Sequence, residues 1–285
     1  MSQDTPQERA LRAGLGLAAL LAAAAPLMIL AFLAYFSWPL LTSGLLPRFF
    51  TQTWNPAAQQ WGLLPMMLGT VWVAGLAMLW AAPLGIGLAL HLVLFAPRGL
   101  ARLLQAVVEF MTGIPTVVYA FAALFLLVPR MRGLLGGSGF SILTASLVLA
   151  LVVVPTITLV ARERLEAVPR RQVQAALAAG ADRWQLCRRV LLPGAWKGLV
   201  TALVLGSGRA VGDTLIALML AGNSLALPTS WASSGRTLTS HIALIFAADF
   251  ASPSFKAVFL CGLILFLYSL ALVVGLRLLQ GRRRP

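Results

Sequence analysis

Acidic and metal-binding residues are scarce in this sequence of 285 residues. It holds eight Asp and Glu residues, two His and two Cys, and charged residues of both signs make up 11% of the chain. No Cys/His cluster has the spacing of metal ligands, and the sequence contains neither a phosphate-binding GxxxxGK[ST] loop nor a nucleophile elbow. The sequence therefore predicts no metal site, no cofactor and no catalysis by this chain alone.

Apolar sequence is abundant. Hydrophobic residues make up 60% of the chain, and the mean hydropathy of +0.89 lies outside the range of soluble globular proteins. A membrane-spanning helix needs about 20 apolar residues. Six runs come near or exceed this length, at about residues 11–41, 63–95, 104–128, 142–160, 199–221 and 257–276. The sequence predicts an all-α, polytopic membrane protein with six transmembrane helices, and the first run is too long for a cleaved signal peptide.

The net charge of +14 is explained by topology rather than by nucleic-acid binding. With the N-terminus inside, 16 of the 22 Lys and Arg residues fall on the cytoplasmic side and five fall outside, while Arg209 lies within a span. Cytoplasmic loops of membrane proteins carry such an excess of cations. We therefore expect both termini in the cytoplasm and no nucleic acid as partner.

The cysteines and histidines do not indicate a further site. Cys187 falls in a cytoplasmic loop and Cys261 in the last span, so the two thiols are expected at different depths and no disulfide is predicted. His91 lies in an apolar run and His241 in an outer segment. Both histidines are interpreted as packing or surface residues.

The longest cytoplasmic loop, residues 162–197, is also the most basic. Val173, Ala176 and Leu177 form a short apolar stripe at helical spacing. Gly180 permits a break, after which residues 184–190 can form a second helix, and Pro193 is expected to end it. Such a helix could lie on the lipid surface or dock onto a soluble partner, and the residue pattern alone leaves both possibilities open.

The loop segment QAALAAGADRWQLCRRVLLP resembles the cytoplasmic signature of importer-type ABC permeases, which reads E-A-A, three residues, G, nine residues, I-x-L-P. Gln174 stands where the family usually has Glu, which removes one charge from the implied contact with an ATPase. The resemblance implies that the residues that contact the ATPase are Gln174, Ala175, Ala176, Gly180, Leu192 and Pro193.

Five further segments, in order from about Trp54 onward, resemble the phosphate-importer permeases that pair with a second, similar permease. They are WNPAAQQWGLLPMMLGT, PLGIGLAL, GIPTVVYAFAALFLLVP, GRAVGDTLIALMLAGN and TLTSHIA. The resemblance implies an ABC type I importer permease fold, a homologous permease subunit, two ATP-binding subunits and an external phosphate-binding protein. Asp213 replaces the Glu that is usual in GRAxGE, and Ala120 stands where the family often has Gly.

The charged pair inside the fifth run is the main candidate for the substrate path. Arg209 and Asp213 are one helical turn apart and share a face, while Gly208 and Gly212 form a GxxxG stripe that lets another helix approach. A guanidinium suits a tetrahedral oxyanion, and a carboxylate could accept a proton from hydrogen phosphate, which sulfate lacks at neutral pH. The alternative is that the two charges form an ion pair that only holds the helices together.

Other polar residues near the path are weaker candidates. Thr116 and Thr214 could offer hydroxyl groups to an oxyanion, although such hydroxyls often bond their own helix. Glu109, near the inner end of the third run, could join the same network or lie at the lipid interface. Pro115 and Pro155 predict kinks or breaks, which in transporters often lie near the substrate.

We therefore expect three regions, and a permease that moves phosphate while partner subunits hydrolyse ATP. Residues 1–62 form a cytoplasmic start, the first helix and an outer segment, residues 63–276 the permease domain, and residues 277–285 a basic cytoplasmic tail. A permease for molybdate, tungstate or sulfate, and a permease-like scaffold for phosphate sensing, are the alternatives. A stand-alone secondary transporter is disfavoured because the loop of residues 162–197 would then lack a purpose.

Overall fold

The computed structural model describes residues 6–42, 49–55, 58, 60–246 and 253–281. Five helical stretches are long and apolar enough to span a membrane, namely Leu11–Pro39, Leu64–Phe95, Thr116–Leu135, Ile142–Glu166 and Ala257–Gly275. A sixth arises if the bent pair Arg183–Gly194 and Trp196–Gly212 counts as one span. The expected all-α membrane fold is confirmed, with one of the six spans bent.

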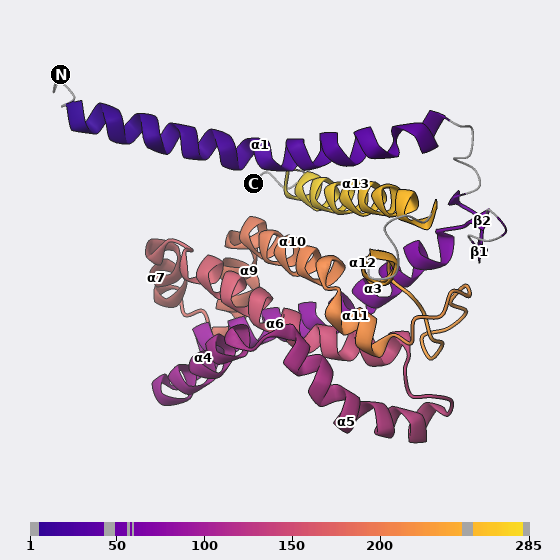
Figure 1. The fold of residues 1–285 in the computed structure, drawn as a ribbon. Coiled ribbons are helices and arrows are strands. Elements are labelled where there is room, and N and C mark those ends of the chain that lie inside the picture. The colour runs from indigo at the N-terminus through magenta and orange to yellow at the C-terminus, as the bar shows by residue number, and fades with distance from the viewer. Residues whose placement is uncertain (1–5, 43–48, 56–57, 59, 247–252, 282–285) are drawn as a thin grey trace.

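Figure 1 shows how the helices and strands follow one another along the chain. Two π-helical turns, η2 and η3, lie among them. In order, the elements are α1 (Pro6–Thr42), β1 (Trp54–Asn55), β2 (Gln60–Trp61), α3 (Leu64–Leu90), η2 (His91–Phe95), α4 (Arg98–Gly113), α5 (Thr116–Leu135), α6 (Ile142–Glu166), α7 (Arg170–Ala178), α8 (Arg183–Leu186), η3 (Cys187–Leu191), α9 (Leu192–Gly194), α10 (Trp196–Gly212), α11 (Leu215–Leu220), α12 (Leu238–Phe246) and α13 (Pro253–Gly281).

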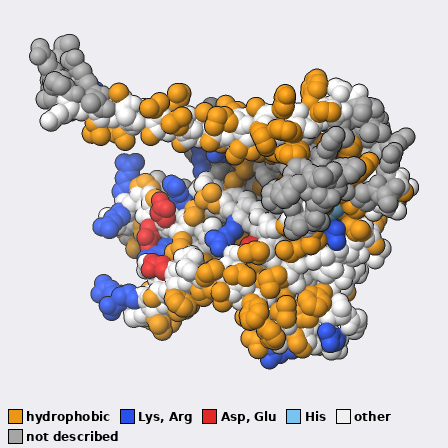
Figure 2. Space-filling view, in the orientation of Figure 1, with side chains coloured by type: hydrophobic (Ala, Val, Ile, Leu, Met, Phe, Trp, Pro, Cys, Tyr) orange, Lys and Arg blue, Asp and Glu red, His pale blue; other side chains and the backbone are white. Residues whose placement is uncertain are grey.

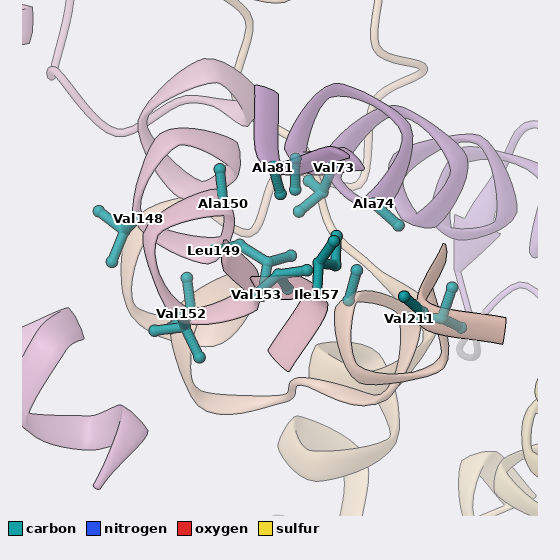
Figure 3. Packing of buried hydrophobic residues seen from close by; sticks show 14 of the residues in the cluster. Val73, Ala74, Ala81, Val148, Leu149, Ala150, Val152, Val153, Ile157 and Val211 are labelled. Carbon is teal, nitrogen blue, oxygen red and sulfur yellow. The ribbon is translucent and has the colours of Figure 1, made fainter. Parts of the chain in front are cut away.

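Helix α6 lies at the centre of the fold, where α3 and α10 pack against it. Ser141 caps its start, because its side chain accepts a hydrogen bond from the Thr144 amide. Much of the length of α6 is buried in an apolar cluster of Val, Leu and Ala side chains from all three helices, part of which is drawn in Figure 3. This packing sets the spacing between α6 and α10.

Two glycines admit Ile157 of α6 into the interface of three helices. A Cβ atom at Gly85 of α3 would lie 2.8 Å from the Ile157 Cβ, and one at Gly206 of α10 would lie 2.7 Å from the Ile157 Cγ1. Ile157 is fully buried and is labelled among the packed side chains in Figure 3. Glycine at both positions therefore lets α3 and α10 approach α6 closely.

Helix α1 packs along α13 and extends past it toward its own N-terminal end (Figure 1). The rings of Phe32 and Phe36 contact Phe259 of α13, with centroids 5.9 and 4.8 Å apart. Most of the other apolar side chains of α1 are exposed, as suits a helix whose solvent is lipid.

The segment before α3 forms a small antiparallel strand pair, β1 and β2. Trp54 of β1 pairs with Trp61 of β2, and the two rings meet edge to face at 5.5 Å. Trp54 also contacts the His241 ring at 4.4 Å, so this hairpin packs on α12. Parts of the expected outer loop, including Pro47 and Pro56, lie outside the described residues.

The boundaries expected for the third span are wrong. A single helix over residues 104–128 is replaced by α4 and α5, and Ile114 between them is extended, with φ −77° and ψ 124°. Pro115 has no amide hydrogen and disfavours a helical residue before it, while Gly113 adds little helix propensity. The break expected at Pro115 is confirmed, whereas α6 continues through Pro155.

The loop of residues 162–197 also differs from the expected boundaries. Helix α7 ends before Gly180, which has a φ of +81°, as the expected break required. The second helical run begins at Arg183 and continues through η3 and past Pro193. It ends only at Ala195, where the chain bends by 72° into α10. Pro193 sits in the first turn of α9, where a missing amide hydrogen is tolerated.

Candidate functional site

The fifth expected span is interrupted at Asp213. Helix α10 ends at Gly212, and Asp213 is extended with a ψ of 117°. Its Oδ1 accepts a hydrogen bond of 2.9 Å from the Ile216 amide at the start of α11. Thr239 of α12 donates to the Asp213 backbone carbonyl at 3.3 Å. Asp213 thus stabilises the start of α11 from the position before its N-cap, Thr214, through a side-chain bond to a first-turn amide of the kind that favours Asp at helix starts.

Arg209 lies one turn before this break, at the last turn of α10. Its Nη1 donates to Oγ1 of Thr156 on α6 at 3.4 Å, and its side chain is half-buried. Within the described part of the chain, no ion pair of 4.0 Å or less joins Arg209 to Asp213. The charge of Arg209 still acts on the Asp213 carboxyl and on the Tyr119 hydroxyl. The two charges are neighbours with separate hydrogen-bond partners.

Tyr119 lies beside the break between α4 and α5, close enough to Arg209 for the charge to act on its hydroxyl. It lies in the first turn of α5, and its hydroxyl donates to the Met111 carbonyl of α4 at 2.9 Å. Thr116 is the first residue of α5 and is half-buried, three positions before Tyr119. Helix α5 also packs against α11. The break before α5 and the break before α11 therefore begin two helices that pack together.

The structure brings some of the expected residues together and leaves others apart. Thr214 is half-buried in the α10–α11 break, next to Asp213. Glu109 is exposed on α4 and accepts a 2.7 Å hydrogen bond from Gln105, and no bond joins it to Arg209 among the described residues. Sequence reasoning missed Thr156. Its position directly after Pro155 was the available signal.

The Gly208 and Gly212 face of α10 is open. Both glycines are exposed, and a Cβ atom added at either would meet nothing within 4 Å. Leu205 and Leu215 extend this exposed face, with 49% and 41% of their surface accessible. No helix of the described chain covers the small-residue stripe, so it can receive a helix of another chain.

Residues of the loop signature divide between exposed and packed positions. Gln174, Ala175 and Gly180 are exposed, while Ala176 is half-buried against the core. A capping box formed by Asp182 and Gln185 starts the next helix. The loop residues Leu192 and Pro193 follow in α9, where Leu192 packs against the core and Pro193 is exposed.

Large apolar side chains are exposed on the same loop. Leu177 is 50% accessible and Trp184 is 65% accessible, on α7 and α8. Figure 2 shows that many Lys and Arg side chains gather at the end of the molecule where α4 and α7 lie. An apolar patch surrounded by cations is the composition of a protein-binding surface.

Residues 81–285 match the family described as binding-protein-dependent transport system inner membrane component. The chain is 36% identical to the "Probable ABC transporter permease protein YqgH" of Bacillus subtilis, with 86% of this chain and 81% of that protein covered. It is 33% identical to the "Phosphate transport system permease protein PstC" of Xylella fastidiosa, with 82% and 78% covered.

The fold is that of ABC importer permeases of type I. A chain of the inward-facing MetNI methionine ABC transporter superposes with a TM-score of 0.58 at 22% identity, covering 78% of this chain and 95% of that one. A chain of a bacterial importer of alginate also gives 0.58, at 18% identity, with 96% and 99% covered. With the sequence match over residues 81–285, these similarities show that the chain belongs to the family of binding-protein-dependent transport system inner membrane components.

Proposed function

We propose that this chain is the permease subunit of an ATP-driven phosphate importer and forms the translocation path with a homologous permease. The support comes from relatives named as phosphate transport system permeases at 29% to 33% identity. The observation that carries the proposal is Arg209, a half-buried cation within a span whose guanidinium makes one hydrogen bond to the described chain. The donors that remain suit an oxyanion.

In this proposal the site residues have different roles. Arg209 contacts the anion, and Thr116 and Thr214 supply hydroxyl groups from the starts of α5 and α11. Asp213 holds the break open through its cap on α11 and limits the net positive charge near the anion. Glu109 is not included, because it is bonded to Gln105 on the exposed side of α4.

The open face of α10 is proposed to receive the homologous permease. Gly208 and Gly212 would allow its helix to approach the backbone, and the path would then run between the two subunits with Arg209 beside it. An external phosphate-binding protein is proposed to deliver the anion on the side of the β1–β2 hairpin.

The loop of α7 to α9 is proposed to bind an ATP-binding subunit through Leu177 and Trp184, so ATP is hydrolysed outside this chain. The N-terminal end of α1, the C-terminal end of α13 and α7 lie toward one side in Figure 1. We propose that this side is cytoplasmic, in the inner membrane of a bacterium. Residues 63–276 would form the permease domain proper, with residues 1–62 and 277–285 as flanking segments.

The test is purification of the complex followed by transport assays. Mass spectrometry of co-purifying proteins should identify two ATP-binding subunits, a second permease and a binding protein. Uptake of radiolabelled phosphate into proteoliposomes should require ATP, and an excess of unlabelled molybdate, tungstate or sulfate should not compete. Competition by one of these anions would assign that anion instead, and assembly without any uptake would favour a sensory scaffold.

Arg209→Lys tests the residue that carries the proposal. Lysine keeps the charge but loses the planar pair of donors, so phosphate uptake should fall at least tenfold while the yield of complex persists. The control is Arg102→Lys, because Arg102 is exposed on α4. Uptake at the wild-type rate in Arg209→Lys would remove Arg209 from the anion site.

A further inference from the structure

Hydroxyl groups within the spans mostly bond carbonyls of their own helices. Thr70 donates to Met66, Thr158 to Val154 and Ser269 to Leu265, at 2.8, 2.8 and 2.9 Å. Such bonds satisfy the hydroxyl where water is absent. Thr156 is different, because within the described residues its hydrogen bond is to Arg209 of another helix.

The chemistry of this contact leaves the Thr156 hydrogen unused. A guanidinium only donates, so Thr156 Oγ1 accepts from Arg209 Nη1. The hydroxyl hydrogen of Thr156 then points elsewhere, and Thr156 is half-buried beside an equally half-buried Arg209. The pair therefore keeps O–H and N–H donors, from α6 and α10, that make no other hydrogen bond to the described residues.

We infer that Thr156 is a second anion-contacting residue, which donates its hydroxyl hydrogen to an oxygen of the anion held by Arg209. This inference rests on the proposed function and adds a residue of α6 to it. The hydroxyl also has a lone pair that can accept a hydrogen bond. It can serve either a bare oxygen or the hydroxyl of hydrogen phosphate, whereas sulfate offers no hydrogen at neutral pH.

Backbone packing fixes the geometry of the pair. Thr156 adjoins Ile157, which fills the space left by Gly206 of α10, and Arg209 follows Gly206 by three residues on α10. The close approach of the two helices thus brings Nη1 of Arg209 to 3.4 Å from Oγ1 of Thr156. The charge on Arg209 strengthens a hydrogen bond to the same anion from a neighbouring hydroxyl, because both donors act on one ligand.

The experiment measures phosphate uptake by the reconstituted complex with four variants of this chain. Thr156→Val keeps the shape and removes the hydroxyl, and Thr156→Ser keeps the hydroxyl. Thr158→Val and Thr158→Ser are the matched controls, because Thr158 lies two residues away on α6 and its hydroxyl donates to the carbonyls of Val154 and, at 3.3 Å, of Gly85 on α3 rather than contacting Arg209. Each variant is also measured for yield of complex and for the ratio of phosphate to sulfate uptake.

We expect Thr156→Val to lower phosphate uptake about tenfold, the loss that follows from removing one hydrogen bond to a charged group. Thr156→Ser should stay within about twofold of wild type, and the yield of complex should be unchanged in both. The phosphate-to-sulfate ratio should fall only in Thr156→Val. In the Arg209→Lys background, Thr156→Val should cost less than it does alone, since the two residues act on one ligand.

Phosphate uptake at the wild-type rate in Thr156→Val would overturn the inference while leaving the proposed function intact. Equal losses in Thr156→Val and Thr158→Val, in step with the yield of complex, would also overturn it, because they would report helix stability. A wild-type complex that assembles but transports no oxyanion would refute the proposed function itself, and the role of Thr156 with it.

Discussion

Gly206→Ala tests the packing that holds the candidate site together. A methyl group at position 206 would lie 2.7 Å from Cγ1 and 2.9 Å from Cδ1 of Ile157, and 3.2 Å from Cγ1 of Val153. Carbon atoms pack best at about 3.5–4.0 Å. Because Ile157 is fully buried between α3 and α10, it has no open space to move into, and α10 must shift away from α6.

The magnitude follows from two opposing effects. Overpacking of a buried site costs about 1–3 kcal/mol, while replacing Gly by Ala within a helix gains about 1 kcal/mol. The clash should exceed the gain, so Gly206→Ala should lower the free energy of unfolding by up to about 2 kcal/mol. Gly75→Ala on α3 is the control, because its methyl group would meet nothing within 4 Å and should be neutral or stabilising.

Thermal unfolding of the purified complex measures the effect, and two double variants make the test specific. Ile157→Ala removes Cγ1 and Cδ1, the two atoms nearest to position 206, and should rescue most of the loss in Gly206→Ala, while the 3.2 Å contact with Val153 Cγ1 remains. It leaves the Ile157 Cβ, which would lie 2.8 Å from a methyl group at Gly85, and should rescue Gly85→Ala only in part. Equal rescue of both, or a Gly206→Ala variant as stable as wild type, would refute the packing argument.

Four shorter predictions follow. Asp213→Asn should preserve the cap on α11, whereas Asp213→Ala should cost about 0.5–2 kcal/mol of stability, measured by thermal unfolding. Gly180→Arg should block phosphate uptake while the protein reaches the membrane in normal yield. Gly180→Ala strains the backbone at φ +81° in the same way but adds only a methyl group, so it should not block uptake. Equal losses of uptake in both variants would exclude docking of an ATPase at this position. Burial lowers the pKa of His241 to about 3, below the usual value of about 6.5. The contribution of neutral His241 to stability is therefore complete above pH 6.5 and is lost as the pH falls toward 3. The midpoint temperature of unfolding should fall between pH 7 and pH 5, and this fall should be smaller in His241→Gln than in the wild type. A reporter enzyme active only outside the cytoplasm should be silent when fused after Pro285 and active at Asn55; activity at both would contradict the topology.

Hydropathy predicted the number and order of the spans, but not where they break. A window of about 20 residues averages over Gly113 and Pro115, so residues 104–128 look continuous although the backbone turns at Ile114. The break between α10 and α11 could have been predicted from Asp213, because Asp is favoured where a helix starts. It was instead interpreted as a face-sharing partner of Arg209, which requires a helix that does not continue there.

Only the part of the candidate site that depends on local sequence could be predicted. A lone Arg209 in an apolar run is visible in the sequence, since a charge in a span is costly and marks function. Its contact with Thr156 is not visible, because it depends on how α6 and α10 meet. That contact is set by the absence of a side chain at Gly206 opposite Ile157, and small residues recur too often in spans to identify one pairing.

The break at Asp213 and Thr214 gives the two parts of one span, α10 and α11, different packing partners. Both α10 and α11 pack on α6, but α10 also packs on α3 and α13, whereas α11 also packs on α5 and α12. Within the described residues, the Asp213 cap and its carbonyl bond to Thr239 join the two parts. Because α10 ends at Gly212, a change of the ψ angle at Asp213 would redirect α11 and leave the hydrogen bonds within α10 intact. The two parts of this span therefore respond to different neighbours, α10 to α3 and α13 and α11 to α5 and α12.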